Sequence, residues 1–304
     1  MDGATYLRRI EKMLNEQAHG TSQFLDTRLS YEHLYEAALI YNKATRALKG
    51  TVSLTTVADQ QGYTLDGDFL GLYLQKPDEN VYIMKLNDGS NDYFLEAQSY
   101  SKTVYDNQTD SVTIPDKFSI RDDDVLDSQV TGSASAEDTG TGGKCTLKVA
   151  TALLTDVSSG DIVHNTTDGS SGVVIKVASD FKSCTTCLFG GTNNYWESAD
   201  AFILQPRGRF KLYFDAPCST AGYTGTLYCL VKPVPVFSSY DVYRFPYDTV
   251  DCFSNYAAWR YKYRDEEFQF GDAFKKDWYR IKKAHSGLYD IGEARGFQLI
   301  PRKR

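Results

Sequence analysis

Few residues of this sequence have the types and spacing that chemistry requires. Cys184 and Cys187 form a CxxC pair, the spacing of many zinc ligands and redox dithiols. A structural zinc site needs a second pair of ligands, but the other four cysteines stand singly and the four histidines form no HxxxH pattern. A redox CxxC lies at a strand-to-helix turn, whereas this pair lies between β-like segments. The spacing therefore predicts buried free thiols.

Other catalytic constellations are equally weak. Paired carboxylates could hydrolyse a glycoside, but with 40 acidic residues some pairing by chance is expected. A Cys218–His285 nucleophile pair has no local motif in its favour. The acidic run Asp122–Asp124 lacks the alternating spacing and the glycine of a calcium loop. We therefore predict no catalytic residue, no metal ion and no cofactor. The carboxylates considered for glycoside chemistry are Asp161, Asp168, Glu197 and Asp200.

Composition points to an ordinary globular chain. The sequence has 304 residues, 41% of them hydrophobic, and a formal net charge of −7, which disfavours a generally basic nucleic-acid-binding protein. The 22 tyrosines suit β-surfaces and partly wet subunit interfaces. The first residues lack the apolar core of a signal peptide, and no apolar run approaches the length of about 18–20 residues that a spanning helix needs. We expect no membrane contact and assembly in a cytosol-like compartment.

The elements that position these residues change type along the chain. Apolar residues at helical spacing predict a first short helix around Leu7–Leu14 and a second that Ser30 caps and Gly50 ends. The middle of the chain has β-branched and aromatic runs separated by turn formers. The helical period returns after Asp248, and a last helix is predicted from a cap at Asp272 to a stop at Gly287.

These patterns predict an α+β fold: a helical bundle built from both termini, with a β-rich excursion that carries an inserted small β domain. The glycine-rich, polar stretch 131–143 has the composition of a flexible linker. The predicted order is N-terminal helices over 1–50, a β-rich region over 51–130, the linker over 131–143, an inserted β module over 144–206, the β-rich region resumed over 207–246, C-terminal helices over 247–286 and an extended C-terminal arm over 287–304.

Aromatic and basic side chains alternate in Trp259–Arg264, a pattern that could bind nucleic acid by stacking and phosphate contact. The same residue types dominate protein interfaces, which we favour for this helix. The predicted inter-subunit helix face consists of Trp259, Tyr261, Tyr263 and Trp278.

The plan of the chain resembles the head-to-tail adaptor (connector) proteins of tailed bacteriophages. Ser30–Leu48 (SYEHLYEAALIYNKATRAL), followed by a threonine-rich strand, an acidic turn and a buried strand, is similar to the opening pattern of that family. Val242–Leu288, in which a proline-marked turn leads into two aromatic-rich helices, is similar to its closing pattern. The resemblance covers about half the chain and rests on patterns, with no invariant signature.

A second resemblance concerns a small β module that is inserted into various phage virion proteins. Its pattern is a GDxV strand, an NxTDGS turn, a paired-glycine turn, and a tryptophan before a closing Gly-Asp. Gly160–Gly172 (GDIVHNTTDGSSG) and Leu188–Leu204 (LFGGTNNYWESADAFIL) match it, except that Ala199 replaces the closing glycine. We expect Trp196 to pack on the closing strand, with Val163, Val173 and Ile175 facing a small core.

The adaptor resemblance implies a structural virion protein at the head–tail interface: a closed ring of twelve copies, docked between the portal protein and the tail or nozzle proteins. Genomic DNA would pass through the channel without specific binding. The C-terminal arm would dock on the portal or on a neighbouring copy. Its predicted docking residues are Arg295, Phe297, Leu299, Ile300, Arg302, Lys303 and Arg304.

Two other functions remain open on the sequence. One is a tail-fibre, baseplate or glycan-binding virion protein, in which Trp196 and the polar turns would contact sugar. The repeats or coiled-coil stretches usual in fibre proteins are not visible. The other is a particle-associated glycosidase, for which the module's carboxylates would be required.

Overall fold

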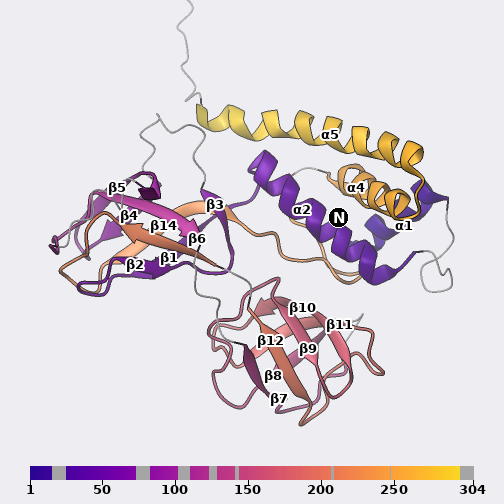
Figure 1. Ribbon diagram of the computed structural model, residues 1–304, viewed down its shortest axis with the longest axis horizontal. Coiled ribbons are helices and arrows are strands. Elements are labelled where there is room, and N and C mark those ends of the chain that lie inside the picture. Colours follow the sequence, from indigo (N-terminus) through magenta and orange to yellow (C-terminus); the bar gives the residue numbers. More distant parts are fainter. Residues whose placement is uncertain are drawn as a thin grey trace, which may run out of the picture. The chain divides into compact units, whose positions relative to one another are not determined.

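The computed structural model describes residues 1–15, 25–72, 83–101, 110–122, 129–140, 144–206, 209–246 and 248–294, with side chains of the last helix described to residue 286. The chain divides into two compact units. One, the helical unit, joins Met1–Leu48 with the segment from Pro235 onward; the other, the β unit, is Lys49–Val234. Figure 1 labels the elements of both.

The expected α+β fold, a helical bundle built from both termini with a β-rich excursion, is wrong. The described chain is mostly β, with fourteen strands in two curled sheets and four helices. Each sheet encloses its own apolar core, so the β region is the larger body of the protein and needs no helical base to bury its side chains. In the helical unit, aromatic residues of the irregular segment 235–246 form part of the core, so the helices do not simply pack on each other.

The first sheet of the β unit has eight strands in the order β1-β14-β4-β5-β6-β13-β2, with β3 also paired to β14. Alternation places Leu212 and Phe214, and Leu86 with Met84, on its buried side. β6 and β13 are antiparallel neighbours, with Asp122 opposite Phe210, although 87 residues separate them in sequence. The strands are β1 (Lys49–Thr55), β2 (Gly62–Thr64), β3 (Phe69–Leu72), β4 (Met84–Asn87), β5 (Asp92–Ala97), β6 (Lys117–Asp122), β13 (Phe210–Phe214) and β14 (Thr224–Val231).

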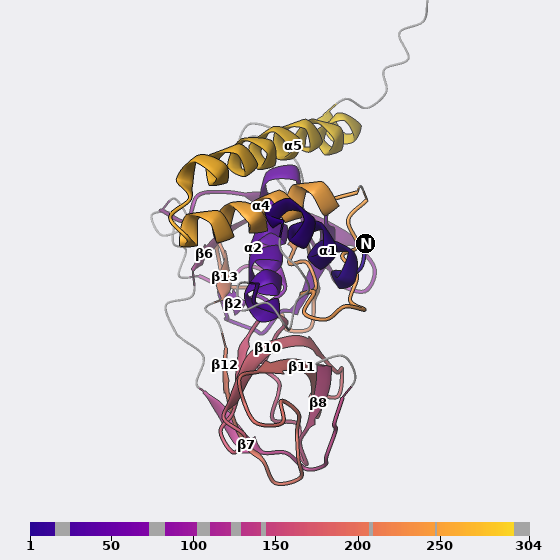
Figure 2. The same cartoon turned by 90° about the vertical axis from the view of Figure 1, so that its right-hand side faces the viewer.

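The second sheet, which we call the module, is inserted between β6 and β13. Its strand order is β7-β12-β9-β10-β11-β8, and Figure 2 shows how it curls. The segment after β7 returns beside β8, where Ser135 N donates to the Lys148 carbonyl at 2.8 Å and Thr146 N donates to Asp138 Oδ2 at 2.9 Å. The strands are β7 (Val130–Ser133), β8 (Lys144–Lys148), β9 (Ile162–Asn165), β10 (Ser170–Val177), β11 (Ser183–Phe189) and β12 (Ala201–Gln205).

The interpretation of 131–143 as a flexible linker is therefore wrong for its described part, 131–140. Val130–Ser133 pairs with β12, and Ala134 is buried in the module core. Its glycine content has a packing reason, because a Cβ on Gly132 would lie 3.0 Å from the ring of Phe202. Residues 141–143 lie outside the described residues.

The module core confirms the expected place of Trp196, which is fully buried and packs edge-on against Phe202 of the closing strand, with ring centroids 6.3 Å apart. Val163 is also buried in this core as expected. Val173 is only half-buried, because Val174 has the opposite parity on β10 and occupies the core. A bulge between Val174 and Lys176 then shifts the register, so Ile175 is buried too.

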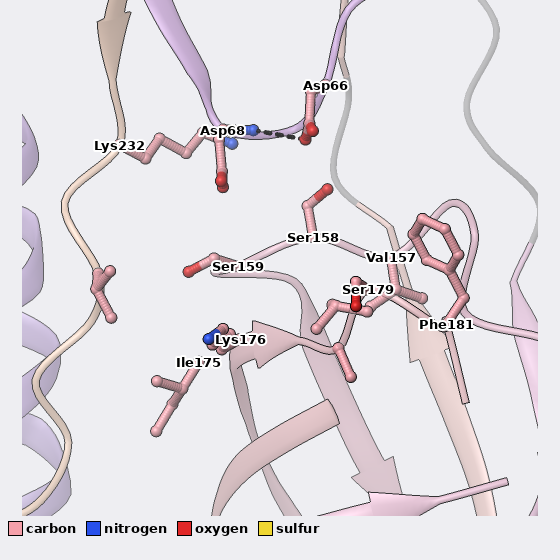
Figure 3. Close-up of a pocket in the computed structure, with 13 residues that line it drawn as sticks. Asp66, Asp68, Val157, Ser158, Ser159, Ile175, Lys176, Ser179, Phe181 and Lys232 are labelled. Carbon is pink, nitrogen blue, oxygen red and sulfur yellow. Dashed lines mark hydrogen bonds between the residues drawn. The ribbon is translucent and has the colours of Figure 1, made fainter. Parts of the chain in front are cut away.

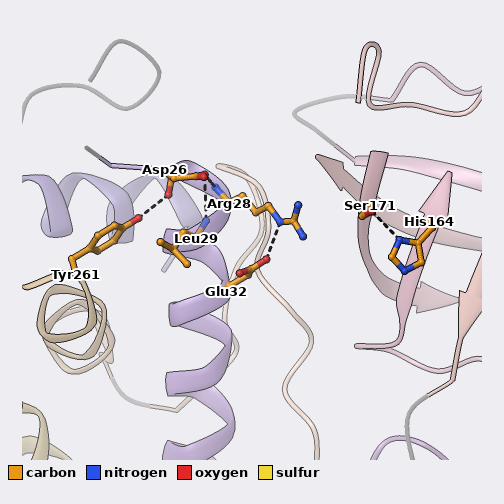
Figure 4. Close-up of polar contacts among 7 residues, drawn as sticks. All are labelled: Asp26, Arg28, Leu29, Glu32, His164, Ser171 and Tyr261. Atoms are coloured by element: carbon orange, nitrogen blue, oxygen red, sulfur yellow. Dashed lines mark hydrogen bonds and ion pairs between the residues drawn. The ribbon is translucent and has the colours of Figure 1, made fainter. Parts of the chain in front are cut away.

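The helices begin and end at other residues than predicted. Asp26 caps α2 (Thr27–Thr45), accepting hydrogen bonds from the backbone N–H of Arg28 and Leu29 (Figure 4). Ser30, the predicted cap, is a buried residue of the first turns whose hydroxyl donates to the Asp26 carbonyl. α2 ends at Arg46, which has a left-handed φ of 57°, and not at Gly50.

The C-terminal helices are α4 (Val250–Arg264) and α5 (Phe268–Ala294). The predicted first helix around Leu7–Leu14 is confirmed as α1, which begins earlier and spans Gly3–Leu14. α5 begins before Asp272 and passes through Gly287, since one glycine costs a helix only about 1 kcal/mol. The extended arm over 287–304 is thus wrong for 287–294, which are helical. Among the described residues, no helix is both long and apolar enough to cross a bilayer.

Candidate assembly surface

The CxxC pair lies on β11, where Cys184 and Cys187 are both buried free thiols. Burial raises the pKa of the Cys184 thiol to about 12, so it is held protonated. No group of three or more His, Cys, Asp or Glu side chains in the described part of the chain is placed to hold a metal ion. Cys218 and His285 belong to different units, and His285 Nδ1 lies 2.8 Å from the Tyr41 hydroxyl.

The carboxylates of the module hold its turns. Asp168 accepts hydrogen bonds from three consecutive backbone N–H groups, those of residues 192–194, at 2.8–3.0 Å. Asp200 Oδ2 accepts from Asn165 Nδ2 at 2.7 Å and from Glu197 N at 2.9 Å. Asp161 Oδ2 accepts from Ser158 N at 2.8 Å. These oxygens are engaged by the module's own backbone and amide donors, which gives them a structural role.

Trp196, a possible sugar contact, is also structural, and the module histidine His164 has a partner of its own. The Trp196 ring is fully buried, so it offers no face on which a sugar could stack. Its indole N–H donates to the Thr186 hydroxyl at 2.9 Å. On β9, His164 Nδ1 lies 2.8 Å from the hydroxyl of Ser171 on the adjacent strand β10 (Figure 4).

The predicted inter-subunit face divides into buried and accessible residues. Tyr261 is fully buried, and its hydroxyl donates to the Asp26 carbonyl at 2.8 Å (Figure 4). Trp278 is buried as well and packs on Tyr256, with ring centroids 5.0 Å apart. Neither can belong to an exposed face, because both lie on the inward sides of their helices. Trp259 and Tyr263 are half-buried and remain accessible.

Trp259 and Tyr263 belong to a larger cluster of side chains that was not predicted from the sequence. Their rings meet edge-on, with centroids 5.8 Å apart. The ring centroid of Phe268, at the start of α5, lies 5.3 Å from that of Tyr263. The ring centroid of Tyr279 lies 6.4 Å from that of Trp259. Phe268 and Tyr279 are 54% and 50% exposed.

Two lysines of α5 lie over these rings. The Lys275 ammonium group lies 5.2 Å from the centroid of Trp259 and 5.5 Å from that of Tyr263. The Lys282 ammonium group lies 4.8 Å from the centroid of the Tyr279 ring. Burial lowers the pKa of Lys282. Such contacts are favourable because the ring face is negative. We call Trp259, Tyr263, Phe268, Lys275, Tyr279 and Lys282 the α4–α5 aromatic surface.

Local sequence explains how the two helices come so close. Gly271 lies against the ring of Tyr263, where a Cβ would be only 2.5 Å from the ring, so a larger residue would push α5 away. The Tyr263 hydroxyl donates to Asp272 Oδ1 at 2.5 Å, which fixes the ring over the first turns of α5. Lys275, Tyr279 and Lys282 follow at spacings of four and three, a helical stripe that could have been read from the sequence.

The predicted docking residues of the C-terminal arm, from Arg295 to Arg304, lie outside the described residues. Comparison with known proteins does not identify a family for this chain. No protein-family model matches the chain, and no curated protein matches it.

Proposed function

We propose that this chain is a structural subunit of a tailed-phage particle, the adaptor that forms a ring of twelve copies between the portal and the tail and surrounds the DNA channel. The observation that carries the proposal is the α4–α5 aromatic surface. A closed ring of identical copies needs a heterologous interface, in which one patch of each copy meets a different patch of the next. Exposed aromatic rings are the residue type that dominates such contacts.

The sequence resemblance to head-to-tail adaptors supports the same proposal from its two helix-bearing segments. The engaged carboxylates of the module and the buried thiols of β11 are consistent with a structural role. The net charge of −7 is consistent with a channel that lets genomic DNA slide past without specific binding. We place the assembled protein in the virion, with assembly in the host cytoplasm.

The test is the mass and shape of the purified protein, alone and mixed with rings of its portal protein, by light scattering and negative-stain imaging. We expect a protein that forms rings on the portal, with one copy per portal subunit. A stable trimer that ignores the portal would overturn the adaptor proposal and favour a fibre protein. Strong binding of the isolated ring to duplex DNA at physiological salt would contradict the passive channel.

A further inference from the structure

The β unit contains a cleft of about 340 Å³ whose lining shares no residue with the α4–α5 aromatic surface. One wall is the turn Asp66–Asp68 before β3, together with Lys232 after β14 (Figure 3). The other wall is the loop at Ser158 and Ser159 and the strand end that follows Ile175 in the module. The volume falls within the range of about 300–1,000 Å³ that small-molecule sites occupy.

Tight contacts fix the edge of this cleft. Gly67 lies so close to the module loop that a Cβ would be 2.3 Å from the Ser158 Cβ, so only glycine fits there. Arg209 spans the same junction: its Nη1 donates to Ser158 Oγ at 3.1 Å, and its Nη2 donates to the Asp156 carbonyl. A cleft whose rim is held by such contacts is preformed, which lowers the entropy cost of binding.

Hydrogen-bonding groups of both kinds face the cleft. In Figure 3 the Asp68 carboxylate, the Ser159 hydroxyl and the Lys176 ammonium group surround the same open space. The Ser159 oxygen is buried and has no hydrogen-bond partner among the described residues, so it is an unused donor and acceptor. Burial raises the pKa of Asp68, as does the nearby charge of Asp66. Phe181 adds apolar surface at one side.

The balance of charge decides what such a cleft can hold. Asp66 and Asp68 are matched by Lys176 and Lys232, so the lining has no net formal charge. A simple anion would face the two aspartates, and a simple cation would face the two lysines. An apolar ligand would leave all four charged groups without partners. A hydroxyl group can donate to a carboxylate and accept from an ammonium group at the same time.

We propose that this cleft binds a neutral, polyhydroxylated ligand of the size of one hexopyranose unit. Its hydroxyl groups donate to Asp68 and accept from Lys176, and the Ser159 hydroxyl completes the network. The C–H face of the sugar packs on Ile175 and Phe181, as sugar rings pack on apolar and aromatic groups. The site is separate from the buried Trp196 and does not depend on ring assembly.

The 304-residue chain is tested by saturation-transfer difference NMR against D-glucose, D-galactose, D-mannose and N-acetyl-D-glucosamine, with choline and acetate as charged probes. We expect saturation of at least one sugar and of neither charged probe. Asp68→Asn and Lys176→Met should each weaken that sugar's affinity at least tenfold. Because Lys176 is exposed, its substitution should leave folding intact.

Matched controls remove the same charges outside the cleft, with Asp122→Asn on β6 and Lys148→Met on β8, both exposed. These controls should bind the sugar as the wild type does. The inference is overturned if none of the four sugars is saturated, if the charged probes bind in their place, or if the cleft variants bind as well as the controls. Because the measurement uses the isolated chain, its failure would leave the ring proposal untouched.

Discussion

The Lys275 ammonium group of α5 lies 5.2 Å from the centre of the Trp259 ring of α4, so a cation on an aromatic face joins the last two helices at their accessible side. A lysine held this way covers part of the ring, and the contact is favourable because the ring face is negative. The exposed aromatic residues around this pair are where assembly can be tested.

Phe268→Ser should weaken assembly without unfolding the chain. Phe268 is 54% exposed, so its removal costs the monomer little, whereas loss of an aromatic anchor from an interface costs about 2 kcal/mol or more. We expect the concentration at which rings form on the portal to rise at least tenfold. The control is Tyr240→Ser, which removes a 77% exposed aromatic residue from another segment of the helical unit. Equal loss of assembly in both variants would count against the α4–α5 aromatic surface.

Ala199→Gly should stabilise the module. Ala199 has a φ of 74°, a left-handed conformation that costs a residue with a Cβ about 1–2 kcal/mol. Part of the gain is lost to the flexibility of glycine in the unfolded chain, so we expect a net gain of about 0.5–1 kcal/mol in urea unfolding. The reverse change, Gly190→Ala, should destabilise, since Gly190 has a φ of 84° and its Cβ would meet nothing within 4 Å. Changes of the same sign would refute the backbone argument.

Thr186→Val should destabilise the module through one hydrogen bond. The Thr186 hydroxyl accepts from the Trp196 indole N–H and donates to the Cys145 carbonyl at 3.1 Å. Valine keeps the shape but leaves a buried N–H unpaired, which costs about 1–3 kcal/mol. The adjacent Thr185→Val, on a half-buried position of the same strand, should change the free energy of unfolding by less than about 0.5 kcal/mol. Equal effects at the two positions would show that the hydroxyl of Thr186 contributes nothing special.

The helical unit should lose stability as the pH falls from 6.5 towards 4. The pKa of His33 is lowered from 6.5 to about 4, mainly by burial and also by the charges of Arg260 and Arg264. His33 therefore binds a proton more tightly in the unfolded chain than in the folded chain. At pH 4.5 this difference lowers the free energy of unfolding by about 2–3 kcal/mol. His285, whose pKa burial also lowers, adds to the loss in the same direction.

Urea unfolding of the wild type and of His33→Gln at pH 7, 6, 5 and 4.5 measures the contribution of His33. The variant should show a shallower fall in the free energy of unfolding. Parallel curves for the two proteins would mean that His33 titrates equally in the folded and unfolded states.

The cysteines should be inert while the protein is folded. All six are buried free thiols, and burial raises the pKa of Cys145 to about 11 and those of Cys184 and Cys252 to about 12. Because only the thiolate reacts, we expect no reaction with a thiol reagent at pH 8 before denaturant is added, and reaction of all six afterwards. Fast native-state labelling of one cysteine would locate a region that opens.

The sequence predicted local structure better than it predicted the fold. Leu7, Ile10 and Leu14 are buried along α1 as their spacing requires. The pairing of β6 with β13 could not be foreseen, because it joins residues on either side of the module and depends on the whole sheet. The glycine-rich segment at 131–140 was misread because its small residues fit a packing constraint, as at Gly132 beneath Phe202, which composition cannot distinguish from a linker.

The candidate surface was half predictable. Trp259 and Tyr263 were found from the alternation of aromatic and basic residues. Tyr261 was included wrongly, although the stripe that places Phe253 and Ala257 inward also carries Tyr261. The cleft had no sequence signal, because Asp68 and Lys176 come together only through the contact between the two sheets.

The module leaves the first sheet after Asp122 and returns at Phe210, two residues that face each other on neighbouring strands. In topological terms it is one long hairpin loop. A gene segment encoding it can therefore be gained, lost or exchanged by recombination while every strand of the surrounding sheet keeps its partner. A chain in which a short turn joins β6 directly to β13 is the form that such an ancestor or relative would take.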